Sequence, residues 1–351
     1  MKNRILILIT VCLALLYSCS GKRITNTENV NTGVPEESDK AEDVAVVEEP
    51  VKEKLVLRAL EGSFEPEMVY VAGGSFIMGA ESEKDNLPHE VELSSFYMAK
   101  YLITVAQWRR FLQEVPLAYD WDWEEAHTIG RFKDTIPTED CPIQQMSWYY
   151  AIVFCNWASM KDGLEPCYKV DRLPEHKNDV IEVTWNKSAN GYRLATDAEW
   201  EYAARGGQES KEYLYAGSDD ITEVAAFGKA SYPVGQMKPN ELGIYDMAGN
   251  ASEWCWDWYD KVMFEWLPKE NPSVDTMEQI RIPPFGTKNK RDYKVERGSD
   301  WWNVPLVIAS RGCYPARHIL VIGIRLVRNG NEEKVNKDHI STDIQFIRQG
   351  L

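Results

Sequence analysis

The sequence predicts a single α+β domain with much irregular structure. Helix-start residues precede apolar side chains at helical spacing, and short β-branched and aromatic runs are bounded by glycines. After Gly207 the chain is rich in turn-forming residues and has no long helical pattern. We expect four segments: a signal peptide over residues 1–18, a tether over 19–65, a globular domain over 66–330 and a C-terminal extension over 331–351.

The N-terminus predicts a lipoprotein signal. Lys2 supplies a positive start, and the apolar run from Ile5 to Leu16 is too short to span a bilayer as a mature helix. An aliphatic residue three places before Cys19 and a serine directly before it are typical of a lipidation site. The alternative is an ordinary cleaved signal followed by an incidental cysteine. A lipid on Cys19 would make the membrane a partner and place the protein in the bacterial cell envelope.

The segment after Cys19 is acidic and poor in aromatic residues. It cannot bury enough apolar surface to offset the entropy lost on ordering, so we expect a flexible tether. An interaction tail is the alternative. The whole chain carries a formal charge of −16, from 55 acidic against 39 basic residues. Such a balance repels polyanions and argues against a nucleic-acid partner.

The globular domain begins with strand signals. Met68–Val71 and Ser75–Gly79 flank a segment with two glycines, which predicts a β-hairpin. Phe96–Leu102 is expected to form a further strand. Trp254, Trp256 and Trp258 alternate along the chain as in a strand, and we expect them to pack in the core rather than to form a binding strip.

Three helices are expected from their capping residues. Thr104 is followed three residues later by Gln107, and Thr196 by Glu199, and both pairs can form a capping box. Ser147 is the third predicted cap. The predicted helices start near Val105, run from Ser147 through Met160, and run from Asp197 to Arg205 before a pair of glycines.

The mature chain would contain five cysteines. Seven are present, but Cys12 lies in the signal peptide and Cys19 would carry the lipid. No C-x-x-C pair occurs, which argues against a zinc knuckle or a thioredoxin-like site. Because five is odd, at least one thiol is expected to be free or to pair between molecules.

Several motifs resemble the formylglycine-generating, or sulfatase-modifying-factor, family. The segment Gly191–Ala203 is similar to the family's RLPTEAEWEYA motif, and Arg297–Trp301 stands where the family has RGGSW. Matching segments occur in family order, among them Gly73–Gly79, Pro239–Asn250 and Ile322–Arg328. The resemblance implies a variant of the C-type lectin fold.

The resemblance also implies a copper oxidase, because family members bind copper through two cysteines just after the RGGSW motif. Here the matching positions hold Asn303 and Ile308. Cu(I) favours soft thiolate ligands, which neither residue offers. We therefore do not expect copper, and we assign no catalytic residue.

A structural calcium site is the second implication. The family's ligands map onto the side chains of Asp246 and Glu253 and the main-chain carbonyls of Gly249 and Ala251. Calcium prefers hard oxygen ligands and tolerates irregular loops. The alternative is a turn without an ion, in which Asp246 caps backbone amides and Glu253 pairs with an arginine.

The family's substrate groove lies around the RGGSW-like turn, which implies a candidate groove in this chain. Its members would be Asp300, Trp301, Trp302 and Asn303, with Arg311 and Arg317 nearby. An aromatic ring beside a carboxylate suits an extended peptide or a sugar. For Trp301 the alternative is a place in the core.

Three hypotheses for function follow. The first is a non-catalytic lipoprotein that binds an envelope protein or a glycan in the groove, or acts as a scaffold. The second is an enzyme of another chemistry on the same fold. The third is a formylglycine-generating oxidase that acts on sulfatase cysteines through displaced ligands.

Overall fold

The computed structural model describes residues 62–115, 138–172, 181–225, 230–284, 292–301, 307–317 and 321–330. The signal peptide, Cys19 and the C-terminal extension lie outside the described residues. All of the described residues belong to one compact unit, Lys54–Leu351. Within these ranges, no helix has the length and apolar character needed to cross a membrane.

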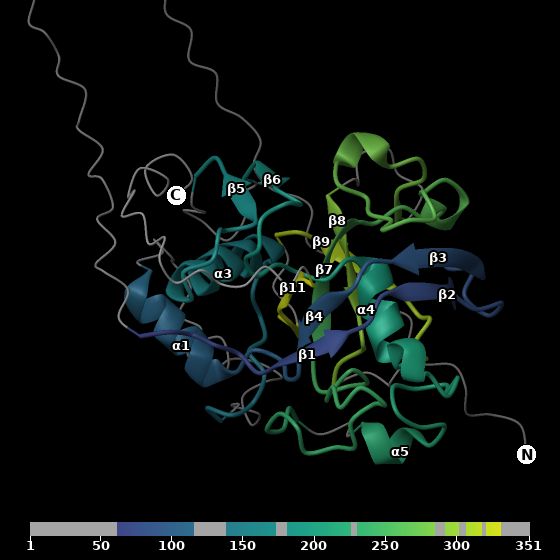
Figure 1. Ribbon diagram of the computed structural model, residues 1–351, viewed down its shortest axis with the longest axis horizontal. Helices are drawn as coiled ribbons and strands as arrows, with labels where there is room; N and C mark the ends of the chain where they lie inside the picture. Colours follow the sequence, from purple (N-terminus) through teal and green to yellow (C-terminus); the bar gives the residue numbers. More distant parts are fainter. Residues whose placement is uncertain are drawn as a thin grey trace, which may run out of the picture. The chain divides into compact units, whose positions relative to one another are not determined.

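A four-stranded sheet forms the centre of this unit (Figure 1). Its strand order is β10 (Ile322–Gly323), β7 (Ser252–Trp258), β8 (Tyr293–Arg297) and β9 (Gly312–Pro315). Strands β7, β8 and β9 are antiparallel, and β10 pairs with β7 in parallel. Successive side chains of a strand point to opposite faces, so one face of this sheet packs on α3 and the other on α4.

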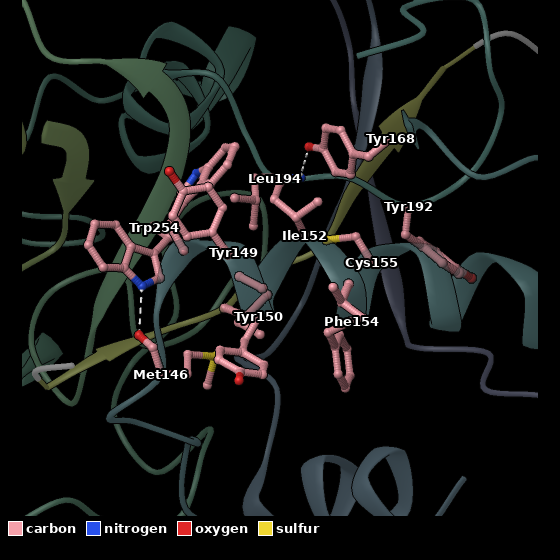
Figure 2. Packing of buried hydrophobic residues seen from close by; sticks show 14 of the residues in the cluster. Met146, Tyr149, Tyr150, Ile152, Phe154, Cys155, Tyr168, Tyr192, Leu194 and Trp254 are labelled. Carbon is pink, nitrogen blue, oxygen red and sulfur yellow. Dashed lines mark hydrogen bonds between the residues drawn. The ribbon is translucent and has the colours of Figure 1, made fainter. Parts of the chain in front are cut away.

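The first face is aromatic. Helix α3 (Trp148–Lys161) packs against Trp254, Trp256 and Trp258 of β7, which confirms the predicted role of these tryptophans in the core. Almost every side chain of α3 is buried, because α1 (Val105–Glu114) covers its other side. Figure 2 shows two hydrogen bonds that lock this cluster, from Trp254 to the Met146 carbonyl and from the Leu194 amide to the Tyr168 hydroxyl.

The second face is covered by α4 (Asp197–Ala204). Thr196 and Glu199 form the predicted capping box, and Gly206 in the left-handed region ends the helix. The capping box of α1, between Thr104 and Gln107, and the Ser147 cap of α3 are also confirmed. These local predictions held because a cap depends only on residues three positions apart.

The predicted hairpin at the start of the domain is wrong. Strand β1 (Met68–Val71) pairs with β4 (Phe96–Ala99), which in turn pairs with β11 (Val327–Asn329). Strand β2 (Gly74–Met78) pairs instead with β3 (His89–Leu93). The connecting backbone is held by distant residues: the Gly73 amide donates to Ser95, and the Ala72 carbonyl accepts from Tyr202. These contacts carry the chain from one sheet to the next instead of reversing it.

The remaining elements are short, and those after Gly207 agree with the expected lack of a long helix there. Strands β5 (Tyr168–Val170) and β6 (Val183–Trp185) form a small hairpin-like pair beside α3. The short helices are η2 (Gly207–Glu209), α5 (Ile221–Val224), η3 (Met263–Glu265) and η4 (Met277–Gln279). The result is the predicted mixture of helices, short strands and irregular chain.

The tether joins the domain slightly before residue 66. The backbone amides of Phe64 and Glu65 donate to the Asp162 carboxylate at the end of α3. The Phe64 ring packs edge-on against Phe154 and Trp157. The last residues of the predicted tether are therefore packed against the domain from Phe64 onward.

Candidate functional site

Arg297 is the centre of a buried ionic network beside the RGGSW-like turn. Its Nε donates to Asp197 Oδ1 at 2.5 Å, and its Nη2 donates to Glu201 Oε2 at 2.9 Å. Its Nη1 donates to the carbonyls of Ile308 and Ser310, at 2.9 and 3.1 Å. Because the side chain is fully buried, these contacts fasten α4 to the segment that follows the turn.

Arg311 completes the network. Its guanidinium lies 2.7 Å from Asp197 Oδ2 and donates to the carbonyl of Asp85 and to Asn86. Burial alone would raise the pKa of Asp197, but Arg297 and Arg311 outweigh it and hold that pKa below the ordinary value. Two arginines thus balance the buried carboxylates of Asp197 and Glu201, which makes the interior charge tolerable.

The two positions that match the family's copper cysteines differ in what the structure describes. Ile308 packs in the core against α4 and its neighbours, with 5% of its surface exposed. Asn303 lies outside the described residues. Cys313, on β9, is half-buried, and burial raises the pKa of its thiol to about 12. One thiol alone does not supply the pair of thiolates that the resemblance implies for copper.

The other mature cysteines give no ligand cluster either. All five are free thiols, and four of them are buried: Cys141, Cys155, Cys167 and Cys255. Across the described ranges, no group of three His, Cys, Asp or Glu side chains is placed to share an ion.

The described residues of the candidate groove, Trp301, Arg311, Arg317 and Asp300, differ in their exposure and in the partners they contact. Trp301 is buried and donates from its indole to Gln144 at 3.1 Å, as its alternative assignment to the core expected. Arg311 also points inward, where it pairs with Asp197 in the ionic network. Arg317 is exposed and pairs with Asp292 at 3.3 Å. Asp300 is half-buried at the end of the turn, while Trp302 and Asn303 lie outside the described residues.

Glu296, which the sequence analysis did not identify, is a partly buried acid next to this turn. The pKa of its carboxyl is raised to about 7, chiefly by burial and to a smaller extent by the charge of Asp300, while a hydrogen bond from Ser252 opposes the shift. Its Oε2 is buried and accepts no hydrogen bond within the described part of the chain. The only sequence signal was a charged residue in the segment Tyr293–Arg297, which forms β8. The residues next to Glu296 in the sequence do not show how far it is buried.

Lys294 is a second buried charge that the sequence analysis missed. Its Nζ lies 3.7 Å from the ring centre of Trp258, 3.9 Å from that of Trp148 and 4.7 Å from that of Trp256. It donates to the Trp256 carbonyl at 2.6 Å. Burial lowers the pKa of this amine, while the indole faces favour the ammonium form. The residue therefore acts as part of the aromatic core.

The predicted calcium turn shows some features expected with a bound ion and some expected without one. Both oxygens of Glu253 accept hydrogen bonds from Arg325, and Oε2 also accepts from Trp200 at 2.8 Å. Asp246 Oδ2 accepts from the Gly235 amide at 2.7 Å. These contacts fit the alternative, a turn without an ion. Asp246 Oδ1, however, is buried without a hydrogen-bond partner in the described residues, as a cation ligand would be.

Comparison with known proteins gives a consistent result. Residues 56–330 match the family described as "Sulfatase-modifying factor enzyme 1-like domain". "Chaperone protein LppX" of Paenibacillus barcinonensis is 38% identical over 221 residues, which cover 55% of this chain and 72% of that protein. The formylglycine-generating enzyme of Thermomonospora curvata is 28% identical, over 66% of this chain and 82% of that protein.

Two further comparisons concern a larger protein and a solved structure. The protein kinase Pkn1 of Chlamydia trachomatis is 31% identical over 67% of this chain, which spans only 33% of the kinase. The structure of Treponema denticola variable protein 1 matches with a TM-score of 0.57 and 25% identity, over 75% of this chain and 94% of that one. It supports the expected α+β architecture.

Glu296 should make stability depend on pH. Its folded-state pKa of about 7 exceeds the ordinary value of 4.5. Between these two pH values the carboxyl is therefore mostly protonated in the folded protein and mostly ionised in the unfolded chain. Stability should therefore fall as pH rises from about 4.5 to about 7. Glu296→Gln should raise the free energy of unfolding by about 2 kcal/mol at pH 8 and change it little at pH 5. Urea unfolding at both pH values measures this, with Glu81→Gln as an exposed control. Equal effects at the two pH values would contradict it.

Calcium binding at Asp246 is a separate prediction. At about 100-fold excess over its Kd, calcium should stabilise the fold by about 2.7 kcal/mol. Asp246→Asn should abolish most of that gain, because it removes the charge of the unpaired oxygen. Thermal unfolding with calcium and with a chelator provides the measurement. If the wild-type protein shows no shift, the Glu253–Arg325 pair alone closes this turn.

Proposed function

Because the chain belongs to the sulfatase-modifying factor enzyme 1-like family, we propose that it is a non-catalytic, lipid-anchored protein that binds polypeptides in the bacterial envelope. The observation that carries the proposal is the environment of Ile308. This residue stands at a copper-ligand position, yet its side chain packs in the core and its carbonyl accepts from Arg297. The contact that ties this segment to the turn is thus present, while position 308 offers no soft ligand for copper.

A polypeptide is favoured over a glycan by two considerations. The family resemblance implies substrates that are cysteine-containing segments of other proteins. The relative with 38% identity carries the name "Chaperone protein LppX". A family surface that receives an extended chain can retain that ability after its redox chemistry is lost, because binding and catalysis use different groups.

The anchor completes the proposal. Lipid on Cys19 and the acidic segment that follows would hold the domain near a membrane while leaving it free to meet its ligand. The packed junction at Phe64 supports a domain attached through its N-terminal side, since Asp162 and the aromatic cluster hold this end of the tether.

The oxidase hypothesis has less support. A displaced copper site would need two thiolates, whereas Cys313 is the only described cysteine that is not buried. An enzyme of another chemistry remains the second alternative. Turnover of a cysteine-containing sulfatase peptide, with oxygen consumption, would favour the oxidase over both other hypotheses.

The proposed function predicts direct binding of unfolded chains. The full-length protein, purified in detergent, should bind fluorescently labelled carboxymethylated α-lactalbumin, a permanently unfolded polypeptide, with a Kd on the order of 1 μM. Fluorescence anisotropy measures the affinity. Asp300→Arg should weaken binding, because it changes the half-buried end of the turn, whereas Glu81→Arg should not. Binding of envelope polysaccharides without binding of the polypeptide would contradict the proposal.

A further inference from the structure

Strand β2 has one edge that pairs with no other strand among the described residues. Its residues Gly74–Met78 pair with His89–Leu93 of β3, and the two strands form a separate sheet (Figure 1). The far edge of β3 is already extended by the chain itself. The Glu92 amide donates to the Lys269 carbonyl at 2.9 Å, and the Glu92 carbonyl accepts from the Asn271 amide at 2.8 Å. This sheet therefore already accepts an added segment at one of its edges.

The outward contacts of Glu92 fix the direction of the backbone groups in β2. In an antiparallel pair, a residue whose amide and carbonyl point outward lies opposite a residue whose amide and carbonyl also point outward. Ser75 lies opposite Glu92, so its amide and carbonyl point away from β3. The pattern repeats at every second residue, so the amide and carbonyl of Ile77 point the same way. These four groups form the free edge of β2.

The two ends of this edge are closed, and its middle is open. The Gly73 carbonyl accepts from a side chain of η2 at 2.5 Å, and the Gly79 amide donates to a side chain of α4 at 2.7 Å. Between them, the outward groups of Ser75 and Ile77 have no hydrogen-bond partner in the described part of the chain. Both residues are exposed, and 58% of the Ile77 surface is accessible. The free edge is therefore within reach of another molecule.

Strand β2 also lacks the features that usually block an exposed edge. Its sequence, Gly-Ser-Phe-Ile-Met, contains no charged residue and no proline, and its register with β3 is regular. Amides and carbonyls that alternate along an edge are satisfied together by the backbone of a second extended chain. The edge is thus a template for an added strand.

The charges beside this edge distinguish a second copy of the chain from another polypeptide. Glu90 and Glu92 lie on the same face of the sheet as Ile77. Lys269 lies 2.8 Å from Glu90 and 4.0 Å from Glu92, and it can balance only one of these two charges. A second copy would bring the same acids and a formal charge of −16, so two copies repel each other. A neutral or basic segment meets no such repulsion.

We infer that the free edge of β2 binds a neutral or basic segment of an unfolded polypeptide as an added strand. Ser75 and Ile77 each offer one amide and one carbonyl to the backbone of that segment, so binding depends little on its sequence. The Ile77 side chain adds an apolar contact with the neighbouring residue of the segment. This inference rests on the proposed polypeptide-binding function. It names a contact surface in addition to the turn that follows β8.

The test uses a fluorescently labelled peptide of alternating Thr and Val residues with a Lys at each end. The control ligand is the same peptide with methyl groups on its backbone amides. Fluorescence anisotropy with the full-length protein measures each Kd. We expect the unmodified peptide to bind about tenfold more tightly, because methylation removes the donors that pair with β2. Hydrogen–deuterium exchange of Gly74–Met78 should slow by about tenfold when the unmodified peptide is bound.

Substitutions at Ser75 separate recognition of the backbone from recognition of the side chain. Ser75→Pro removes an outward amide without removing a hydrogen bond between β2 and β3, and it should weaken peptide binding by about tenfold. Ser75→Ala keeps that amide and is the matched control, which should bind as the wild-type protein does. Thermal unfolding checks that both variants fold. If the proline variant does not fold, the exchange measurement on the wild-type protein decides alone.

The outcomes separate this inference from the proposed function. Peptide binding without slower exchange in Gly74–Met78 overturns the edge as the site and leaves polypeptide binding intact. Equal binding by Ser75→Pro and Ser75→Ala also overturns it, as does binding of unfolded α-lactalbumin without binding of the peptide. Protection of β2 that grows with protein concentration in the absence of peptide would make a second copy the occupant and overturn the inference. No binding of the peptide or of unfolded α-lactalbumin overturns the proposed function itself.

Discussion

The buried guanidinium of Arg297 is the contact on which the rest of the structure depends. It joins the last residue of β8 to Asp197 and Glu201 of α4 and to the carbonyls of Ile308 and Ser310. A guanidinium is suited to this role because it carries several donors in a rigid plane and stays charged when buried. Removing it would leave two carboxylates in the interior with less positive charge to balance them, a cost of about 3–5 kcal/mol. The turn that follows β8 therefore begins at a residue whose side chain is tied to α4.

The two faces of the central sheet handle buried charge in different ways. On the α4 face, carboxylates and guanidinium groups pair directly, as Arg297 and Arg311 do with Asp197. On the α3 face, Lys294 is surrounded by indole rings and a carbonyl, with no ion pair to it among the described residues. Glu296, on this same face, has neither kind of partner for its Oε2. The α3 face thus holds one cation within its aromatic packing and one carboxyl oxygen without a hydrogen bond in the described residues.

Local sequence signals predicted the helices well. The capping pairs Thr104–Gln107 and Thr196–Glu199 lie three residues apart, so their geometry follows from nearby residues alone. The alternation of tryptophans in β7 predicted their common face for the same reason. The family motif also singled out Arg297, although its partners in α4 are 96 to 100 positions away in the sequence.

The parts that failed depend on contacts between distant segments. The first hairpin was wrong because Ser95 and Tyr202 hold the backbone at Ala72 and Gly73, and neither residue is part of the local pattern. The inward direction of Arg311 follows from Asp197 and Asn86, which come much earlier in the chain. Glu296 could not be identified, because its neighbours follow from the pairing of β8 with β9, which places Gly312, 16 positions later, opposite it. Pairing and burial are tertiary properties, and local spacing does not determine them.

The proposed function requires that the chain keeps the turn of its family but lacks the pair of soft ligands through which the resemblance implies copper binding. Elemental analysis of the purified full-length protein, after incubation with Cu(I) and dialysis, tests this claim most directly. We expect substoichiometric copper, because Ile308 offers no ligand atom that suits Cu(I) and Cys313 is a single thiol. One tightly held copper per chain, lost on Cys313→Ser, would contradict it and make the protein an oxidase with displaced ligands.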